Sequence, residues 1–201
     1  MKNKRKIIGN ILLITGLLLL LGAGGLYFYN MVESNRQKEA SEEVVDKVRS
    51  EVSRAVESQA EGASAEYSEA SDLEPVVIDG SPYDGYLTIP KIELEMAVYD
   101  TWNDTYLKSS VCRYYGSPYT NDFIIAGHNY RSGFGKLKTL TPGDEVYFTD
   151  MSGNVIKYVV SLTEVIDGTD IDGMISGGWD LSLYTCTYGG EARFTVRCVR
   201  E

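Results

Sequence analysis

Residues 182–196 read Ser182-Leu183-Tyr184-Thr185-Cys186-Thr187-Tyr188-Gly189-Gly190-Glu191-Ala192-Arg193-Phe194-Thr195-Val196. Apolar residues alternate on both sides of the glycine pair, at 181 and 183 and then at 194, 196 and 198, which predicts two strands joined by a turn. A hairpin of this kind places Cys186 at the end of one strand and Arg193 at the start of the next. The sequence therefore predicts a cysteine and an arginine side by side near a sheet edge.

The alternation also assigns the faces of the second strand. Residues 194, 196 and 198 share one parity and are expected to face a core, whereas Arg193, Thr195 and Arg197 share the other. Arg197 is thus a second candidate for an arginine near Cys186. We prefer Arg193, because it lies nearer the turn.

The N-terminus predicts a membrane anchor. Residues 1–6 are basic, and residues 7–32 contain no charged side chain, a length that spans about 30 Å of hydrocarbon. A cleaved signal peptide has a shorter apolar core, and here the run ends in the aromatic segment Leu26-Tyr27-Phe28-Tyr29, typical of a membrane interface. The basic flank predicts a cytoplasmic N-terminus and a single pass, with the rest of the chain outside the cell.

The segment 33–82 is expected to be an acidic spacer, partly helical or disordered. Val44, Val48, Val52 and Val56 recur every four residues, which predicts a helix with a narrow apolar stripe. The stripe covers barely two heptads, so we expect a solvated stalk rather than a coiled coil. Residues 58–79 are too rich in Glu, Ser, Ala and Gly to fold alone.

Residues 83–201 are expected to form the folded domain, which is mostly β. Eight short apolar or alternating runs bounded by Gly, Pro, Asn or Asp predict strands. They are 86–89, 93–99, 112–115, 122–127, 145–150, 155–166, 181–185 and 192–199. Two short helices are expected at 104–109 and 134–140. This pattern favours a single β-barrel or sandwich.

The only histidine, His128, follows the apolar run Phe123-Ile124-Ile125-Ala126, a candidate central strand. Its position just past a buried strand is similar to that of Cys186. A thiolate nucleophile, a proton carrier and a permanent cation are the minimum for acyl transfer at a peptide carbonyl. Cys186, His128 and Arg193 are therefore the candidate catalytic residues.

Composition excludes several other classes. With one histidine, a structural zinc site is close to excluded. After residue 6 the chain carries 15 basic and 29 acidic residues, which argues against nucleic acid as a partner. Cys112 and Cys198 are expected to be small buried hydrophobes, although in an external protein they could also pair.

Several motifs resemble those of sortases, the cysteine transpeptidases of Gram-positive cell surfaces. Ser182-Leu183-Tyr184-Thr185-Cys186 resembles the family's Thr-Leu-x-Thr-Cys signature, with Ser182 in place of the usual threonine. The likeness covers about 85–201 and includes Leu87-Thr88-Ile89-Pro90-Lys91-Ile92, Ala126-Gly127-His128-Asn129 and Leu140-Thr141-Pro142-Gly143-Asp144. It implies a closed eight-stranded β-barrel with two short helices.

The resemblance also implies roles. Cys186 would attack the threonine carbonyl of a motif similar to Leu-Pro-x-Thr-Gly at the C-terminus of a secreted surface protein, forming a thioester. His128 would move the protons and Arg193 would bind the substrate backbone and oxyanion, with Asn129, Thr185 and Leu183 as supporting or substrate-binding residues. The acceptor would be an amine of peptidoglycan or of lipid II.

Within the family we expect a member similar to classes A, D and E. Pilin-polymerising class C members often carry an N-terminal lid with an Asp-Pro-aromatic motif. Ser81-Pro82-Tyr83 matches this motif only in part. The connection 167–179 is too short for the extra helix of the haem-uptake class. Two alternatives lie outside the family. An L,D-transpeptidase would have a histidine and a glycine just before the cysteine, whereas this chain has Leu183-Tyr184-Thr185. A non-catalytic surface binding module would need neither a free thiol nor His128.

The connection 167–179 is expected to be a loop over the substrate groove. Glu164, Asp167, Asp170 and Asp172 offer oxygen ligands for calcium, which some relatives bind. Their spacing matches no complete calcium loop, so we expect a solvated acidic loop and no cofactor.

Overall fold

The computed structural model describes residues 2–61, 72–120 and 122–201. These fall into two compact units, Met1–Arg36 and Gln37–Glu201. Helix α1 (Lys2–Glu61) begins in the first unit and ends in the second. In the first unit its large apolar side chains from Ile7 to Tyr29 are exposed, and the helix is long and apolar enough to cross a membrane.

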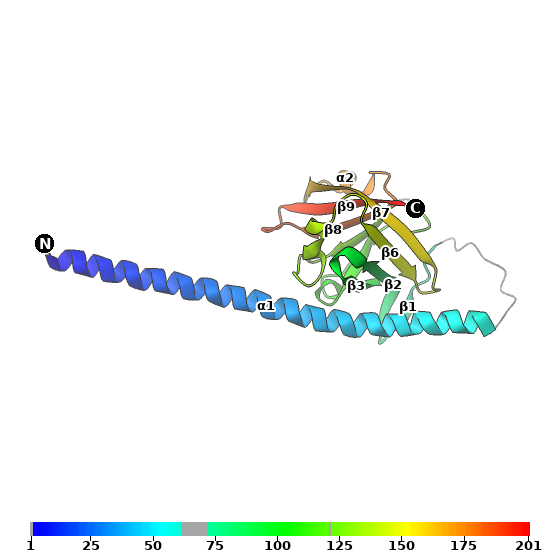
Figure 1. Cartoon of the computed structure of the whole chain (residues 1–201), viewed down its shortest axis with the longest axis horizontal. Helices are drawn as coiled ribbons and strands as arrows, with labels where there is room; N and C mark the ends of the chain where they lie inside the picture. The colour runs from blue at the N-terminus through cyan, green and yellow to red at the C-terminus, as the bar shows by residue number, and fades with distance from the viewer. Residues whose placement is uncertain (1, 62–71, 121) are drawn as a thin grey trace. The chain divides into compact units, whose positions relative to one another are not determined.

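The second unit is built on a nine-stranded sheet (Figure 1). Its strands are β1 (Val76–Ile78), β2 (Ser81–Ile89), β3 (Leu94–Tyr99), β4 (Val111–Tyr115), β5 (Phe123–Gly127), β6 (Glu145–Asp150), β7 (Val155–Asp167), β8 (Leu181–Cys186) and β9 (Ala192–Arg200). All eight predicted strands are confirmed. The short strand β1 was not predicted, and with β2 it starts the sheet before the expected boundary at residue 83.

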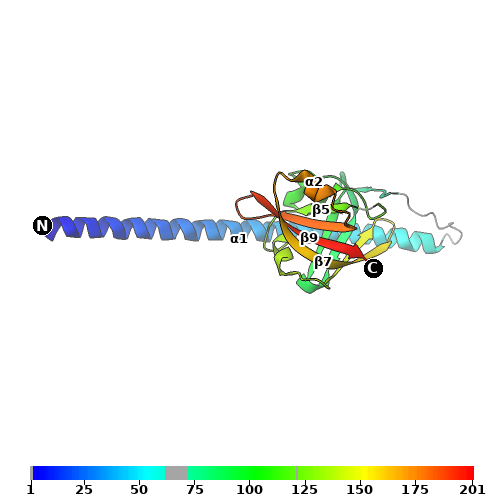
Figure 2. The same ribbon diagram turned by 90° about the horizontal axis from the view of Figure 1, so that it is seen from above.

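Eight of the strands close into a barrel. The order is β2-β3-β4-β5-β8-β9-β7-β6, and β6 pairs with β2 to complete the circuit. The long antiparallel pair of β7 and β9 is visible from above in Figure 2. Closure removes the unpaired edges of β2 to β9, while β1 extends the sheet beside β2.

Two neighbouring pairs in this circuit are parallel, β3 with β4 and β5 with β8. The second pair positions the functional residues. Because parallel strands end at the same edge of a sheet, the residues that follow β5 and β8 emerge beside each other.

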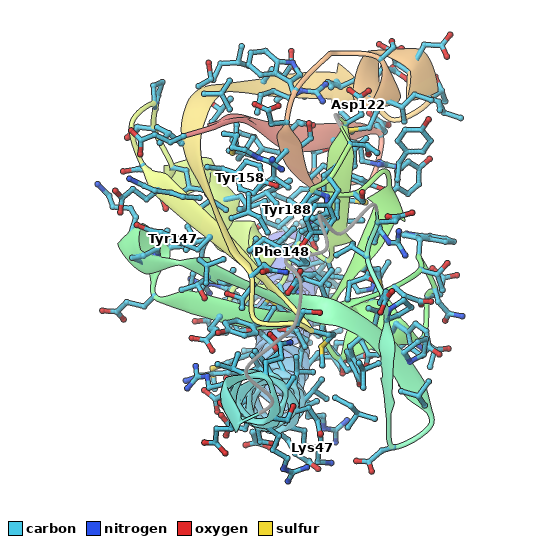
Figure 3. The ribbon with its side chains drawn as sticks, turned by 90° about the vertical axis from the view of Figure 1, so that its right-hand side faces the viewer. Lys47, Asp122, Tyr147, Phe148, Tyr158 and Tyr188 are labelled. Atoms are coloured by element: carbon cyan, nitrogen blue, oxygen red, sulfur yellow. The ribbon has the colours of Figure 1, made fainter. Side chains whose placement is uncertain are left out.

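The barrel interior is apolar and fully buried. Phe148 of β6 and Tyr158 of β7 have no exposed surface and lie inside the barrel in Figure 3. Val196 and Cys198 of β9 join the same cluster, and Phe194 packs against it, as the parity of β9 predicted. Each such side chain stabilises the fold by about 1.5–3 kcal/mol through burial.

Helix α1 also packs within the second unit. Val45, Val48 and Val52 are at most 5% exposed and cluster with Tyr83 and Tyr99 of the barrel. The ion pair of Lys47 with Asp79 and the contact of Arg49 with Glu95 flank this cluster. The expectation of a solvated stalk therefore does not hold for residues 45–52, because their apolar stripe has a partner in the same chain.

The short helices follow the predicted places. Both expected helices occur as 3₁₀ turns, η2 (Tyr106–Lys108) and η3 (Phe134–Thr139), and η1 (Pro90–Ile92) follows β2. The connection between β7 and β8 holds the unpredicted helix α2 (Ile171–Ile175). Asp170 caps α2, since its Oδ1 accepts a hydrogen bond from the Gly173 amide at 2.8 Å.

Candidate active site

Cys186 and Arg193 are direct partners in the β8–β9 ladder. Side chains directly opposite each other in an antiparallel pair lie on the same face, with Cβ atoms about 4.5–5.5 Å apart. The hairpin predicted from the glycine pair therefore puts both side chains on one face of the sheet. Cys186 is partly exposed, as a nucleophile must be.

His128 reaches the same place from the neighbouring strand. Gly127, the last residue of β5, pairs with Thr185 of β8, so the next residue along each strand is His128 or Cys186. Gly127 leaves no room for a side chain, because an added Cβ would lie 2.6 Å from the ring of Phe134. Phe134 of η3 therefore packs directly against the last residue of β5.

The three residues line one cleft of about 390 Å³. Its walls are largely apolar and include residues from the β3–β4 and β7–β8 connections. The other apolar and aromatic lining residues are Trp102, Leu107, Tyr114, Ala126, Ile171, Met174 and Tyr184. A cleft of this size and character suits an extended peptide segment.

The surroundings of His128 favour its neutral form. Partial burial lowers the pKa of the imidazole below 6.5, and Lys108 lowers it further, whereas the carboxylate of Asp104 acts in the opposite direction. The ring also contacts Tyr130 edge-on at 5.1 Å between centroids. A neutral imidazole can accept a proton, and its imidazolium form can donate one.

Arg193 is held by its own hairpin. Its Nη1 atom donates hydrogen bonds to the carbonyl oxygens of Gly190 at 2.9 Å and Ala192 at 3.2 Å. An added Cβ on Gly168 would lie 3.1 Å from this Nη1, so the guanidinium passes close to the β7–β8 connection. The arginine is therefore oriented before any substrate binds.

Arg197, the second candidate from the parity of β9, is a structural residue. Only 2% of its surface is exposed. Its guanidinium donates to Glu164 Oε1 at 2.7 Å, Ser182 Oγ at 2.8 Å and the carbonyls of Gly173 and Met174 at 2.6 and 3.1 Å. It thus ties α2 to the barrel, and it does not line the cleft.

The three expected supporting residues do not line the cleft. Leu183 is fully buried in the barrel core, so any support from it comes through packing. Thr185 is 4% exposed, and its Oγ1 finds no hydrogen-bond partner among the described residues. Asn129 is half-buried beside His128.

Several cleft residues were missed by the sequence analysis. Tyr184 shares the parity of Cys186 and packs edge-on against Tyr114 at 5.5 Å, so the period of two could have revealed it. Trp102 and Asp104 lie in an irregular connection, where no periodicity marks the inward side chains. Only the folded barrel brings them to the site.

The other two cysteines are unsuited to catalysis. All three cysteines are free thiols, and Cys112 and Cys198 are buried. Burial raises the pKa of both thiols to about 12. Because the thiolate is the reactive form, both stay inert at neutral pH.

The acidic residues before and within the β7–β8 connection have partners of their own. Glu164 binds Arg197, and Asp167 Oδ1 accepts from the Thr169 amide at 2.9 Å and hydroxyl at 2.6 Å. Asp170 caps α2. Among the described residues, no three carboxylate, thiol or imidazole side chains converge on a common point that would hold a metal ion.

Comparison with known proteins identifies the family. The family model for the sortase domain matches residues 87–201 of this chain. Sortase C1 of Streptococcus suis is 27% identical with a TM-score of 0.53, covering 59% of this chain and 73% of that one. Sortase C1 of Streptococcus agalactiae is 25% identical with a TM-score of 0.57, covering 81% and 98%. No curated protein matches significantly.

A class A structure has a similar fold. Sortase A of Listeria monocytogenes is 24% identical with a TM-score of 0.51, covering 59% of this chain and 87% of that one. Class C and class A structures are thus both similar to the chain, and the comparisons give no support to the expectation that it stands apart from class C. The matched domain contains the closed barrel, His128, Cys186 and Arg193, and the chain belongs to the sortase family of cysteine transpeptidases.

Proposed function

We propose that this chain is a membrane-anchored sortase that cleaves a sorting motif similar to Leu-Pro-x-Thr-Gly and joins the new carboxyl end to an amine of the cell wall. The observation that supports this most directly is the pairing of Cys186 with Arg193, one strand away from His128 and in the same cleft. The substrates would be secreted surface proteins with a C-terminal motif, and the acceptor an amine of peptidoglycan or lipid II.

The reaction has two halves. The neutral His128 imidazole first accepts the proton of the Cys186 thiol. The thiolate then attacks the threonine carbonyl, and as the carbon–nitrogen bond breaks, the His128 imidazolium gives this proton to the leaving amine. The resulting thioester is then attacked by the acceptor amine, which loses a proton to His128 as the thiolate departs. Arg193 donates hydrogen bonds to the oxyanion in each tetrahedral intermediate.

The first unit supports the proposed membrane anchor. Its helix is long and apolar enough to cross a membrane, and its exposed apolar side chains are consistent with lipid contact. The basic residues before the apolar run support a cytoplasmic N-terminus and an extracellular barrel. With a single pass, the substrate cleft would lie on the side where secreted proteins arrive.

We further propose attachment to the wall rather than pilus assembly. Ser81-Pro82-Tyr83, which partly matches the lid motif of class C, lies in β2, where Pro82 pairs with Val77 of β1. The cleft lining begins at Trp102, so none of the described residues before it lines the cleft. Sortase C of Streptococcus pneumoniae, which has the same fold, has been described in terms of its pilin substrate specificity, and pilin polymerisation is therefore the second candidate.

The test uses the full chain in detergent micelles with a fluorogenic Leu-Pro-Gln-Thr-Gly peptide. Glycine-type amines are offered as wall acceptors, and a lysine-containing pilin peptide as the alternative acceptor. Cleavage and ligation to the glycine amine are expected for wild type and for Cys112→Ala, and neither for Cys186→Ala. Equal activity of Cys186→Ala would overturn the enzymatic proposal, and ligation to the lysine peptide alone would favour pilus assembly.

A further inference from the structure

The substrate cleft carries an excess of negative charge. Three of its lining residues are aspartates, namely Asp104, Asp167 and Asp170, and all three are exposed. Among the described residues of the lining, Arg193 is the one permanent cation. The cleft thus presents more carboxylates than the positive charge of the catalytic group can balance.

The three carboxylates flank the catalytic residues from two sides. Asp104 comes from the β3–β4 connection and favours the charged form of His128. Asp167 ends β7, and its pKa is lowered by hydrogen bonds from Thr169 and, to a smaller extent, by the charge of Arg193. Asp170 follows at the start of α2. A peptide that reaches the Cys186 sulfur through this largely apolar cleft therefore passes these three carboxylates.

Internal partners do not remove these charges. The hydrogen bonds to Asp167 and Asp170 come from neutral amides and a hydroxyl of their own connection. The ion pairs among residues 2–61, 72–120 and 122–201 involve none of the three carboxylates. A cation brought in by the substrate would meet carboxylates that have no ion pair within 4.0 Å among the described residues.

Taking the proposed function as given, we propose that the cleft selects sorting peptides that carry a lysine or arginine next to the scissile threonine or just before the motif. An acidic side chain there would face like charges in a partly apolar cleft, where repulsion is screened less than in open water. Asp104 and Asp167 are the specificity-determining residues. The apolar residues of the cleft would bind the uncharged residues of the sorting motif.

The test compares hydrolysis of Leu-Pro-Lys-Thr-Gly, Leu-Pro-Gln-Thr-Gly and Leu-Pro-Glu-Thr-Gly peptides by the full chain in detergent, without an amine acceptor. A fourth peptide, Lys-Leu-Pro-Gln-Thr-Gly, places the cation before the motif. We expect kcat/KM to favour one of the lysine peptides over the glutamate peptide by about tenfold at low salt. The preference should shrink with added salt, because exposed charges are screened within about 10 Å at 0.1 M.

The double variant Asp104→Asn/Asp167→Asn should reduce that ratio to about twofold, while Glu57→Gln on the exposed face of α1 should leave it unchanged. The measured quantity is the ratio of kcat/KM between the lysine and glutamate peptides for the same variant. A change in His128 that slows both peptides equally therefore cancels. Equal rates for lysine and glutamate peptides, or an unchanged ratio in the double variant, would overturn the inference while leaving the enzyme a sortase. Failure of wild type to cleave any of the peptides would instead count against the proposed function.

Discussion

Cys186 and Arg193 face each other across the β8–β9 ladder, one residue from each strand of a single hairpin. The turn at Gly189-Gly190 sets the register of the hairpin. The position of the thiol relative to the arginine therefore depends on local sequence. His128 needs a longer-range contact, the parallel pairing of β5 with β8. The site therefore depends on the whole barrel for its proton carrier, and on one turn for its nucleophile and cation.

Replacing Arg193 with glutamine should lower kcat/KM by about 10²- to 10³-fold, the usual loss when an oxyanion donor is removed. Circular dichroism should remain that of wild type, since the residue is partly exposed and its hydrogen bonds are to its own hairpin. Arg54→Gln on α1 provides the control, with unchanged activity. An active Arg193→Gln enzyme would remove the arginine from the proposed mechanism.

Arg197 is expected to act on stability. Arg197→Met should lower the free energy of unfolding by about 3 kcal/mol, because it leaves the Ser182 hydroxyl, the carbonyls of Gly173 and Met174, and Glu164 without their shared donor. Urea unfolding measures this. Arg54→Met, which removes a surface pair with Glu51, should cost no more than about 1 kcal/mol. Equal losses would contradict the structural role.

The single histidine allows a direct titration by NMR. In the folded chain the imidazole pKa should lie below 6.5, so the neutral form dominates at pH 7 and the imidazolium appears only as pH falls through that lowered value. Asp104→Asn should lower the pKa further, because a carboxylate that favours the cation is removed. Lys108→Gln should raise it. Shifts in the reverse directions would show that these side chains do not act on His128.

The docked part of α1 should contribute to stability. Val48 has no exposed surface, and Val48→Ala should lower the free energy of unfolding by about 1–3 kcal/mol through lost contacts and a residual cavity. Val56, which is 47% exposed, is the matched control, and Val56→Ala should change little. If both variants unfold at the same urea concentration as wild type, residues 45–52 do not belong to the folded unit.

Local patterns were enough to predict most of the barrel. Strand boundaries followed from alternation and from Gly, Pro and Asp. That the barrel is closed was implied only by the resemblance to sortases.

The sequence departs from the sortase signature at Ser182, where the family usually has threonine. The Ser182 hydroxyl accepts a hydrogen bond from Arg197, as a threonine hydroxyl also could. The sequence alone could not show this, because parity placed Arg197 on the same face as Arg193 and gave no sign of the α2 segment that covers it.

Other features depend on contacts between distant segments. The valine stripe of α1 predicted a helix but not its partner, since nothing local connects Val48 with the barrel strands. The three-residue strand β1 is too short for a periodic signal. In the cleft, Asp104 comes from an irregular connection, so only the fold places its carboxylate near His128.

The most direct test of the central claim is mass spectrometry of the intact full-length protein after brief incubation with a sorting-motif peptide and no amine acceptor. A covalent adduct with the mass of the peptide up to its threonine, attached to Cys186 and released by hydroxylamine, is the predicted result. Cys112→Ala should form the same adduct. An adduct that persists in Cys186→Ala, or peptide cleavage with no cysteine adduct in wild type, would contradict the proposed mechanism.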